Sequence, residues 1–292
     1  MAELTDLSYI KSLLSSHGFT FSKALGQNFL INPAVCPKMA ELSGLHPDAG
    51  ALEIGPGIGV LTKELAKRSK HTVAIELDKR LLPVLDETLK DFSNISIIND
   101  DVLKADLQRI IENEFYSRGI NEIYVCANLP YYITSPVIMR LLESELPFKA
   151  LTFMVQKEAA DRLCAAVGSR DSGAVTVAVA VRAKAEKLFS VKAGSFFPAP
   201  KVDSAVIKLT PYETPPLAVE SMKFFTSFVR AAFEQRRKTL SNSVSSALGF
   251  DKSDIIEILK SCGISEAVRA EALSLEDLAR ISNALYKLKI KE

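Results

Sequence analysis

Short apolar runs recur along the first part of the chain, and amphipathic segments separate most of them. The runs are rich in Val, Ile and Ala, which is typical of strands buried in a parallel sheet. They lie at 51–54, 72–75, 95–98, 123–127, 150–155, 174–182 and 205–209. Their alternation with helical segments predicts an α/β fold with a seven-stranded, mostly parallel sheet. No helical segment separates the last two runs, so we expect them to form an antiparallel pair at the sheet edge.

The pattern changes at a proline-rich break, residues 211–216. Beyond the break, apolar residues recur with helical spacing and no strand-like run appears. The expected helices lie at 222–233, 236–247, 252–260 and 275–287. We therefore divide the chain into a sheet domain, residues 1–211, and a small all-helical domain, residues 212–292.

The composition is that of an ordinary globular protein of 292 residues, 48% hydrophobic and 24% charged. No apolar run is long enough to span a bilayer, and the N-terminus lacks the basic start of a signal peptide, so we expect a cytosolic protein. The net charge of +1 means that nucleic-acid binding would depend on local clusters of basic residues. The cysteines are widely spaced and histidines are few, so we expect no metal site and no disulfide.

A glycine-rich turn follows the first apolar run. Gly55, Gly57 and Gly59 separate that run from a predicted helix at 60–68, which is the context that a nucleotide-binding loop needs. A dinucleotide fingerprint requires a third glycine where this chain has Val60, and the lysine of a phosphate-binding loop is missing. The pattern is similar to the first motif of S-adenosylmethionine-dependent methyltransferases. A purely structural turn is the alternative.

Acidic residues follow the second and third apolar runs. Glu76 lies ~20 residues after the glycine turn, where a carboxylate can accept hydrogen bonds from both hydroxyls of a ribose. Asp78 is a second candidate there, or a cap for the next helix. After the third run, Asp101 is the candidate acceptor for an adenine amine, with Val102 beside the ring. Asp100 competes with Asp101, and a solvated turn is the alternative to both.

Asn128-Leu129-Pro130-Tyr131 follows the fourth apolar run directly. Ligands of open α/β sheets bind outside the carboxyl ends of the strands. An amide, a proline and an aromatic ring at such an end predict a grip on a flat, polar group such as the N6 amine of adenine. We expect the side-chain oxygen of Asn128 and the carbonyl of Leu129 to accept the N6 hydrogens, and Tyr131 to stack on the base. Pro130 removes a competing N–H and stiffens the turn.

Two further segments combine aromatic, amide and basic side chains. In 196–202, two prolines predict a stiff, extended loop, from which we expect Phe197 to stack on a base while Phe196 lies in the core. In 23–30, the residue types favour a surface connection held by two apolar anchors over a lid.

The helical domain carries a cluster of basic residues that includes Arg230, Arg236, Arg237 and Lys238. With Phe233 at helical spacing, this cluster is a candidate contact for RNA backbone. A solvated charged face is the alternative.

Together, these motifs resemble the family of ribosomal small-subunit RNA adenine N6,N6-dimethyltransferases. The resemblance extends nearly end to end, with the motifs in the family's order. It is carried by Gly26–Leu30, Glu53–Gly59, Glu76, Asp101, Asn128–Tyr131 and Phe197–Val202. Asp100 departs from the family's pattern, in which a glycine usually precedes the acid.

The resemblance implies a Rossmann-like class I methyltransferase domain with S-adenosylmethionine as methyl donor. The substrate would be two adjacent adenosines in a hairpin loop near the 3′ end of the RNA, within an immature 30S subunit, and the enzyme a monomer. Residues 1–31 would form a flap, so that Gln27, Asn28 and Leu30 contact the cofactor and the surface-connection interpretation is wrong. The other expected cofactor contacts are Gly55, Gly57, Gly59, Glu76, Asp101, Val102 and Asn128. The expected RNA contacts are Tyr131, Phe197, Lys201, Arg230, Arg236, Arg237 and Lys238.

Three alternatives share some of these features. Antibiotic-resistance methyltransferases of large-subunit RNA use the same cofactor and catalytic motif, but the flap and the long helical domain favour the small subunit. A mainly non-catalytic factor that checks ribosome assembly is a second alternative, disfavoured by the complete set of motifs. An NAD-dependent enzyme is disfavoured by Val60.

Overall fold

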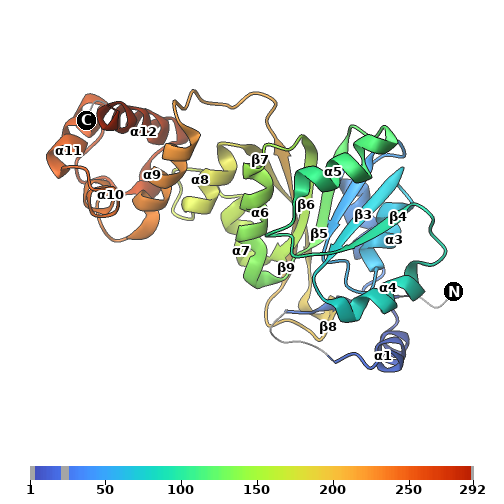
Figure 1. Cartoon of the computed structure of the whole chain (residues 1–292). Helices are drawn as coiled ribbons and strands as arrows, with labels where there is room; N and C mark the ends of the chain where they lie inside the picture. Colours follow the sequence, from blue (N-terminus) through green and yellow to red (C-terminus); the bar gives the residue numbers. More distant parts are fainter. Residues whose placement is uncertain (1–3, 21–25, 291–292) are drawn as a thin grey trace. The chain divides into compact units, whose positions relative to one another are not determined.

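The computed structural model describes residues 4–20 and 26–290 (Figure 1). By its internal contacts the chain separates into two compact units. The first comprises Met1–Ala160 and Glu186–Pro211, and the second comprises Asp161–Ala185 and Tyr212–Glu292. The sequence-based division places 161–185 with the sheet, whereas its contacts place it with the helices of the second unit.

A seven-stranded sheet forms the centre of the first unit, with the strand order β4-β3-β2-β5-β6-β9-β7. The strands are β2 (Gly50–Ile54), β3 (His71–Glu76), β4 (Ile95–Asn99), β5 (Ile123–Asn128), β6 (Phe148–Gln156), β7 (Ala183–Val191) and β9 (Ser204–Pro211). The strands from β4 to β6 are parallel, and β9 is antiparallel to β6. This confirms the predicted α/β fold with a mostly parallel, Rossmann-like sheet. The chain order reverses between β2 and β5, and ligands bind at such a switch point.

Helices connect these strands, as the alternating pattern predicts. They are α2 (Val35–Leu42), α3 (Val60–Ala66), η2 (Lys79–Leu81), α4 (Leu82–Leu89), α5 (Leu107–Glu114), η3 (Tyr116–Arg118), η4 (Tyr131–Ile133), α6 (Thr134–Glu143), α7 (Lys157–Leu163) and η5 (Ala193–Ser195). Apolar side chains of α2 and α3 pack against one face of β2, β5 and β6 in a single buried cluster. The sequence analysis did not anticipate α5, which begins where the Asp106 side chain accepts a hydrogen bond from the Arg109 N–H at 3.0 Å.

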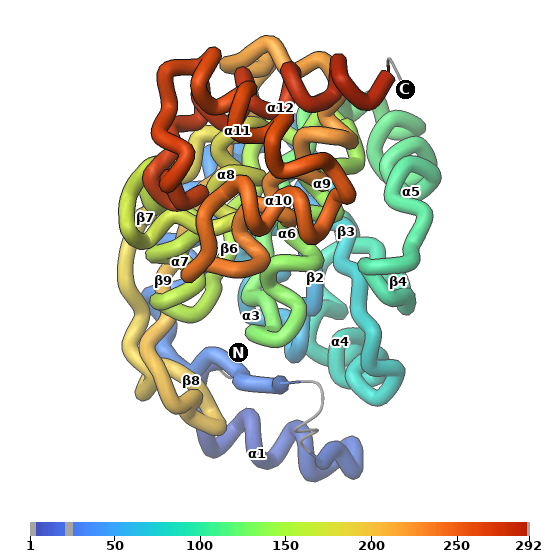
Figure 2. Tube along the Cα trace, turned by 90° about the vertical axis from the view of Figure 1, so that its left-hand side faces the viewer, coloured from blue at the N-terminus to red at the C-terminus, as the bar shows by residue number. Residues whose placement is uncertain are grey.

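The N-terminal segment is anchored to the glycine turn and to β8 of the first unit. Helix α1 spans Leu7–Ser16. Strand β1 (Phe29–Leu30) pairs antiparallel with β8 (Phe196–Phe197), and Figure 2 shows α1, β1 and β8 close together. Buried side chains of α1 share a cluster with Ile58 of the glycine turn. Lys23, Ala24 and Leu25 of the predicted flap lie outside the described residues.

The prediction of a strand at 174–182 is wrong. Residues Ala174–Ala180 form helix α8, and the edge strand is β7 further along the chain. The run of Ala, Val and Thr fits both the two-residue period of a strand and the 3.6-residue period of a helix. Packing favours the helix, because Val177 and Val181, four residues apart, both enter the core of the second unit. Strand β7 was missed because it lies at the sheet edge and its residues are mostly not buried.

The second unit is all-helical beyond Tyr212, as predicted. Its helices there are α9 (Met222–Glu234), α10 (Leu240–Leu248), α11 (Lys252–Ser261), η6 (Ala270–Ala272) and α12 (Leu275–Lys289). Phe224, Phe225 and Phe228 of α9 are buried in its core. The helix expected from residue 236 begins only at Leu240, after a turn that carries the basic residues.

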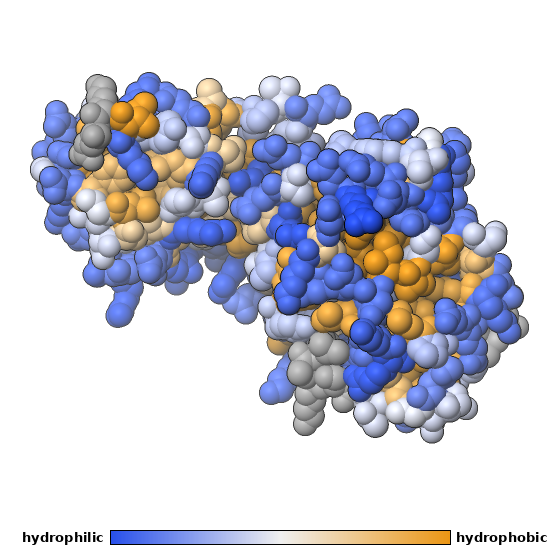
Figure 3. Space-filling view, in the orientation of Figure 1, coloured by the Kyte–Doolittle hydropathy of each residue, from blue (hydrophilic) through white to orange (hydrophobic). Residues whose placement is uncertain are grey.

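On the face shown in Figure 3, polar residues alternate with patches of hydrophobic residues on each unit. No helix in the described part of the chain has the length and apolar character needed to cross a membrane.

Candidate functional site

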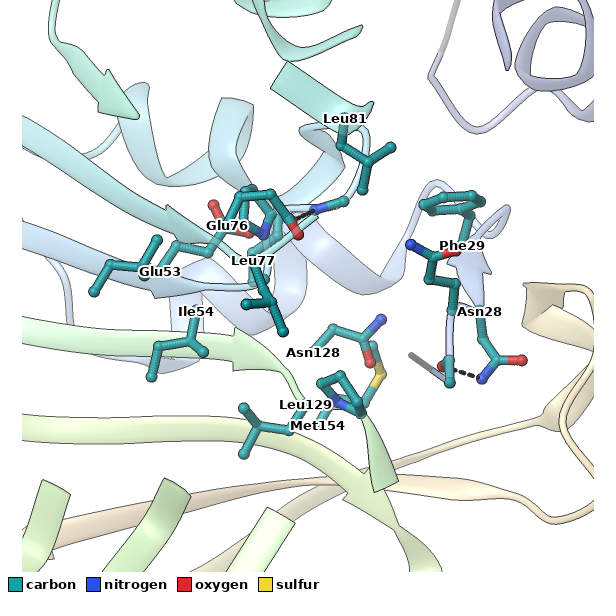
Figure 4. A pocket seen from close by; sticks show the side chains of 18 of the residues that line it. Asn28, Phe29, Glu53, Ile54, Glu76, Leu77, Leu81, Asn128, Leu129 and Met154 are labelled. Carbon is teal, nitrogen blue, oxygen red and sulfur yellow. Dashed lines mark hydrogen bonds between the residues drawn. The ribbon is translucent and has the colours of Figure 1, made fainter. Parts of the chain in front are cut away.

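A cavity of about 1160 Å³, including its open mouth, lies in the first unit at the carboxyl ends of β2, β3 and β5. Figure 4 shows side chains from several separate segments converging on it. Most of the predicted site residues line it, namely Gln27, Asn28, Leu30, Gly55, Gly57, Glu76, Asp101, Val102, Asn128, Leu129, Pro130 and Tyr131. Gly59, Phe197 and Lys201 are not among the lining residues.

The glycine turn adopts a backbone that other residues resist. Gly57 has a φ of 61°, and a Cβ there would lie 3.3 Å from Cε1 of Phe29. Gly59 has a φ of 88° and caps α3, and a Cβ there would lie 2.9 Å from Cδ2 of Leu89. These glycines let the loop pass close beneath the flap strand and the helix α4, so that its backbone borders the cavity.

Glu76 is held rigidly at the end of β3. Its Oε1 accepts a hydrogen bond from the Asp78 N–H at 2.7 Å, and its Oε2 accepts one from the Gly57 N–H at 3.3 Å (Figure 4). Burial raises the pKa of Glu76, while the backbone donors Asp78 and Gly57 oppose that rise. A carboxylate has about four acceptor positions, so both oxygens retain capacity for a ligand's hydroxyl groups.

Asp78 acts as a cap and a link to the flap. Its side chain accepts a hydrogen bond from the Arg80 N–H and so caps η2, as one of the two interpretations predicts. The guanidinium of Arg80 lies 2.6 Å from its Oδ2 and lowers the pKa of Asp78. Gln27 Nε2 donates to the same oxygen at 2.8 Å. Gln27 therefore lines the cavity with its amide nitrogen directed at Asp78.

Asp100 and Asp101 both border the cavity, where they also form a turn. Asp101 Oδ1 accepts a hydrogen bond from the Leu103 N–H at 2.9 Å, and its Oδ2 lies 3.7 Å from Lys104 Nζ. Val102 is buried and lines the cavity. The turn interpretation and the ligand interpretation are thus compatible.

Asn128 ends β5 with its side chain at the centre of the view in Figure 4. In the part of the chain that the structure describes, nothing hydrogen-bonds its side-chain amide. The Leu129 N–H donates to the carbonyl of Met154 at 3.1 Å, which fixes the backbone after the strand. The Tyr131 hydroxyl lies 2.9 Å from Ser204 Oγ, which orients its half-buried ring at the cavity wall.

Glu53 is a lining residue that the sequence analysis missed as a candidate in its own right. It is 1% exposed, and its Oε2 has no hydrogen-bond partner among the described residues. Burial raises the pKa of Glu53 to about 8, and the negative charge of Glu76 adds to that rise. A single acid in the apolar run 51–54 was the available signal. Because Glu53 lines the cavity, its unpaired Oε2 can form a hydrogen bond with a ligand group.

The remaining predicted contacts lie elsewhere. Phe196 is buried in the core as expected, whereas Lys11 Nζ lies over the Phe197 ring, 5.0 Å from its centroid. Lys201 is exposed on the first unit, and Arg230, Arg237 and Lys238 are exposed on the second. Arg236 donates to the carbonyl oxygens of Arg170 and Ser172, which ties it to its own unit.

The cysteines and acids of the described residues form no group of three or more metal ligands. All four cysteines are free. Cys126 is fully buried, and burial raises the pKa of its thiol to about 12, so it is an inert core residue.

A Rossmann-like sheet whose switch point carries this glycine turn, a strand-end carboxylate and an Asn-Leu-Pro-Tyr segment defines a methyltransferase. The family model described as "Ribosomal RNA adenine dimethylase" matches residues 18–287. The chain belongs to this family and is thus an rRNA-modifying methyltransferase, which confirms the resemblance stated above.

Individual proteins agree with this assignment. "Ribosomal RNA small subunit methyltransferase A" of Geobacillus thermodenitrificans (strain NG80-2) is 47% identical over 281 residues, which is 95% of each chain. The protein of that name from Bacillus cytotoxicus is 44% identical over 294 residues and covers 100% of both chains. A dimethyladenosine transferase from Plasmodium falciparum superposes with a TM-score of 0.73 at 27% identity, covering 90% of this chain and 98% of that one. The 23S rRNA methyltransferase ErmE superposes with a TM-score of 0.67 at 27% identity, covering 89% of this chain and 100% of that one.

Proposed function

We propose that the protein dimethylates N6 of two adjacent adenosines in a hairpin loop near the 3′ end of small-subunit rRNA. The observation that carries the proposal is that Asn128 and Tyr131 open onto the same cavity as Glu76 and the glycine turn. A methyl donor and a methyl acceptor can therefore occupy adjoining parts of one site. The choice of the small subunit is supported by the names of the curated relatives, which align over nearly the whole chain.

S-adenosylmethionine is the methyl donor that fits the glycine-turn side of the cavity, and it supplies a methyl group already activated by the sulfonium. We assign the ribose hydroxyls to Glu76 and the adenine amine to Asp101, with Val102 against the ring. The unpartnered Oε2 of Glu53 supports a hydrogen-bonding ligand group on this side of the cavity. Asn28 and Leu30 of the flap segment cover the donor, and the Asn28 Nδ2 bond to the Gly26 carbonyl, 2.9 Å long, holds this turn in shape.

The target adenine would lie on the Asn128 side. Its N6 lone pair is delocalised into the ring, so the amine is a poor nucleophile until its geometry changes. The Asn128 side-chain oxygen and the Leu129 carbonyl oxygen accept the two N6 hydrogens and bias the nitrogen toward a tetrahedral shape. The Tyr131 ring, oriented by Ser204, stacks on the base. No side chain need act as a base, because the N6 proton becomes acidic only after transfer and then leaves to solvent.

The RNA must present an unpaired adenosine, because a stacked base cannot reach a cavity of this kind. We propose that the exposed Lys201, Arg230, Arg237 and Lys238 contact RNA backbone. Arg236, bound to carbonyl groups of its own unit, positions the basic turn instead. We further propose that the protein acts as a monomer in the cytoplasm, on small subunits that are still being assembled.

The test is methyl transfer to ribosomal subunits from a strain that lacks the modification. We expect N6,N6-dimethyladenosine at two neighbouring positions of small-subunit rRNA, detected by mass spectrometry of RNA digests, and no methylation of large-subunit rRNA. The large subunit is included because of the structural similarity to ErmE. Methylation of large-subunit rRNA alone, or of neither rRNA, would overturn the proposal.

A further inference from the structure

Two exposed hydrophobic side chains stand at the cavity. The large hydrophobic residues that the structure shows as exposed are Leu42, Leu77, Tyr116, Tyr132, Val202, Tyr212 and Ile290. Of these, Leu77 and Tyr132 also line the cavity. Leu77 follows Glu76 directly, so the donor's adenine ring accounts for its exposure. Tyr132, which is 55% exposed, is not explained by the donor or by the target base.

Tyr132 differs from its neighbour Tyr131 in its surroundings. The Tyr131 hydroxyl is bound to Ser204 Oγ at 2.9 Å, and its ring is partly buried. Among the described residues, the Tyr132 hydroxyl has no hydrogen-bond partner. One edge of the Tyr132 ring borders the flap, because a Cβ on Gly26 would lie 3.6 Å from its Cδ1. The ring is thus held at one side and open to solvent at the other.

The local backbone makes the two rings face in different directions. Tyr131 and Tyr132 are consecutive residues of the 3₁₀-helix η4. Such a helix has about three residues per turn, so neighbouring side chains point roughly 120° apart. The two rings therefore do not serve the same base.

We propose that Tyr132 is a stacking platform for the base next to the target adenine. This inference rests on the proposed function, which it deepens by assigning a position to the second adenosine while the first one reacts. A half-exposed aromatic ring at the mouth of the site gains by covering a flat base, and stacking of this kind does not require a particular base. The platform keeps the second adenosine of the pair close to the cavity between successive transfers.

The test compares Tyr132→Ala, Tyr132→Phe and the control Tyr116→Ala, which removes an exposed tyrosine in η3 that does not line the cavity. On unmodified small subunits, we expect Tyr132→Ala to raise KM for the subunit about tenfold, within the range that one stacked base provides. We also expect RNA with only one dimethylated adenosine to accumulate. Tyr132→Phe keeps the ring and should behave like wild type, as should Tyr116→Ala.

A second measurement uses subunits in which the neighbouring adenosine is replaced by an abasic site. We expect this replacement to slow the wild type and Tyr132→Phe, and to have no further effect on Tyr132→Ala, because both changes remove the same contact. Equal penalties in all variants would overturn the platform, and so would loss of S-adenosylmethionine binding by Tyr132→Ala in calorimetry. If wild type itself transfers no methyl group to small subunits, the proposed function fails instead.

Discussion

The two sides of the cavity are built differently. On the donor side, backbone N–H groups occupy both oxygens of Glu76, and the glycine turn packs against Phe29 and Leu89. On the acceptor side, the Asn128 amide has no partner within the described chain, and Tyr132 is more than half exposed. Apart from Glu53 Oε2, the donor side is largely hydrogen-bonded within the protein before a ligand arrives, whereas we propose that an RNA base satisfies the amide of the acceptor side. We infer that the small cofactor binds to a preorganised surface, whereas the acceptor side becomes ordered when the large substrate binds.

The largest effect should come from Asn128→Ala, which removes the side-chain oxygen that we propose accepts an N6 hydrogen. We expect kcat to fall by about 10²–10³-fold, as for loss of one preorganised polar group in other enzymes. Calorimetry should show S-adenosylmethionine affinity little changed, because the proposed donor contacts with Glu76, Asp101 and the glycine turn remain. Asn121→Ala, an exposed asparagine just before β5, is the matched control. Near-normal transfer by Asn128→Ala would contradict the division between the two sides.

Glu76→Ala should affect the donor side instead. Loss of hydrogen bonds from the ribose to a charged oxygen is worth about 1.5–3 kcal/mol, so S-adenosylmethionine affinity should fall roughly tenfold to a hundredfold. Saturating donor should restore much of the rate. Glu122→Ala, which removes an ion-paired carboxylate outside the cavity, is the control. Unchanged affinity in calorimetry would refute the ribose assignment.

Glu53 provides a test of the donor side by pH. Its pKa is raised from 4.5 to about 8, so the folded protein holds a proton that the unfolded chain releases above about pH 4.5. The neutral Glu53 side chain therefore contributes fully to the free energy of unfolding below about pH 4.5, and this contribution is lost as the pH rises to about 8. Glu53→Gln keeps a neutral side chain at every pH. At pH 9 the free energy of unfolding of this variant should exceed that of wild type by a few kcal/mol, on the order expected for such a pKa shift. At pH 4 it should not. Urea unfolding at both pH values measures this, and parallel pH profiles would exclude a neutral buried Glu53.

The smallest effect should follow from Ser204→Ala. Loss of the bond to the Tyr131 hydroxyl costs about 0.5–1.5 kcal/mol, which corresponds to a two- to tenfold rise in KM for the RNA substrate. Tyr131→Phe removes the same bond and should give the same result, and the double variant should add nothing. Additive effects would show that the two hydroxyls act separately.

Local sequence was sufficient for features that depend on a few adjacent residues. The glycine turn, the strand-end Glu76 and the Asn128 segment all lie where the apolar runs end, and parallel strands bring those ends together. Helix α8 was not predictable in the same way, because Val177 and Val181 are directed by a core formed by distant helices. The Gln27–Asp78–Arg80 arrangement joins residues 51 positions apart and leaves no periodic trace in the sequence. Glu53 was visible as an acid in an apolar run, but only the structure reveals that its buried Oε2 has no hydrogen-bond partner among the described residues.

The pairing of β1 with β8 also bears on the order in which the ligands bind. Phe29 and Leu30 follow the flap residues Gln27 and Asn28, while Phe196 and Phe197 lead directly into the loop with Lys201. A donor that fixes the flap therefore fixes the loop as well, because the two strands share one ladder. Binding of the donor should then tighten binding of RNA, and RNA should tighten binding of the donor by the same factor. With this coupling, the enzyme should bind its RNA substrate most tightly when the methyl donor is already bound.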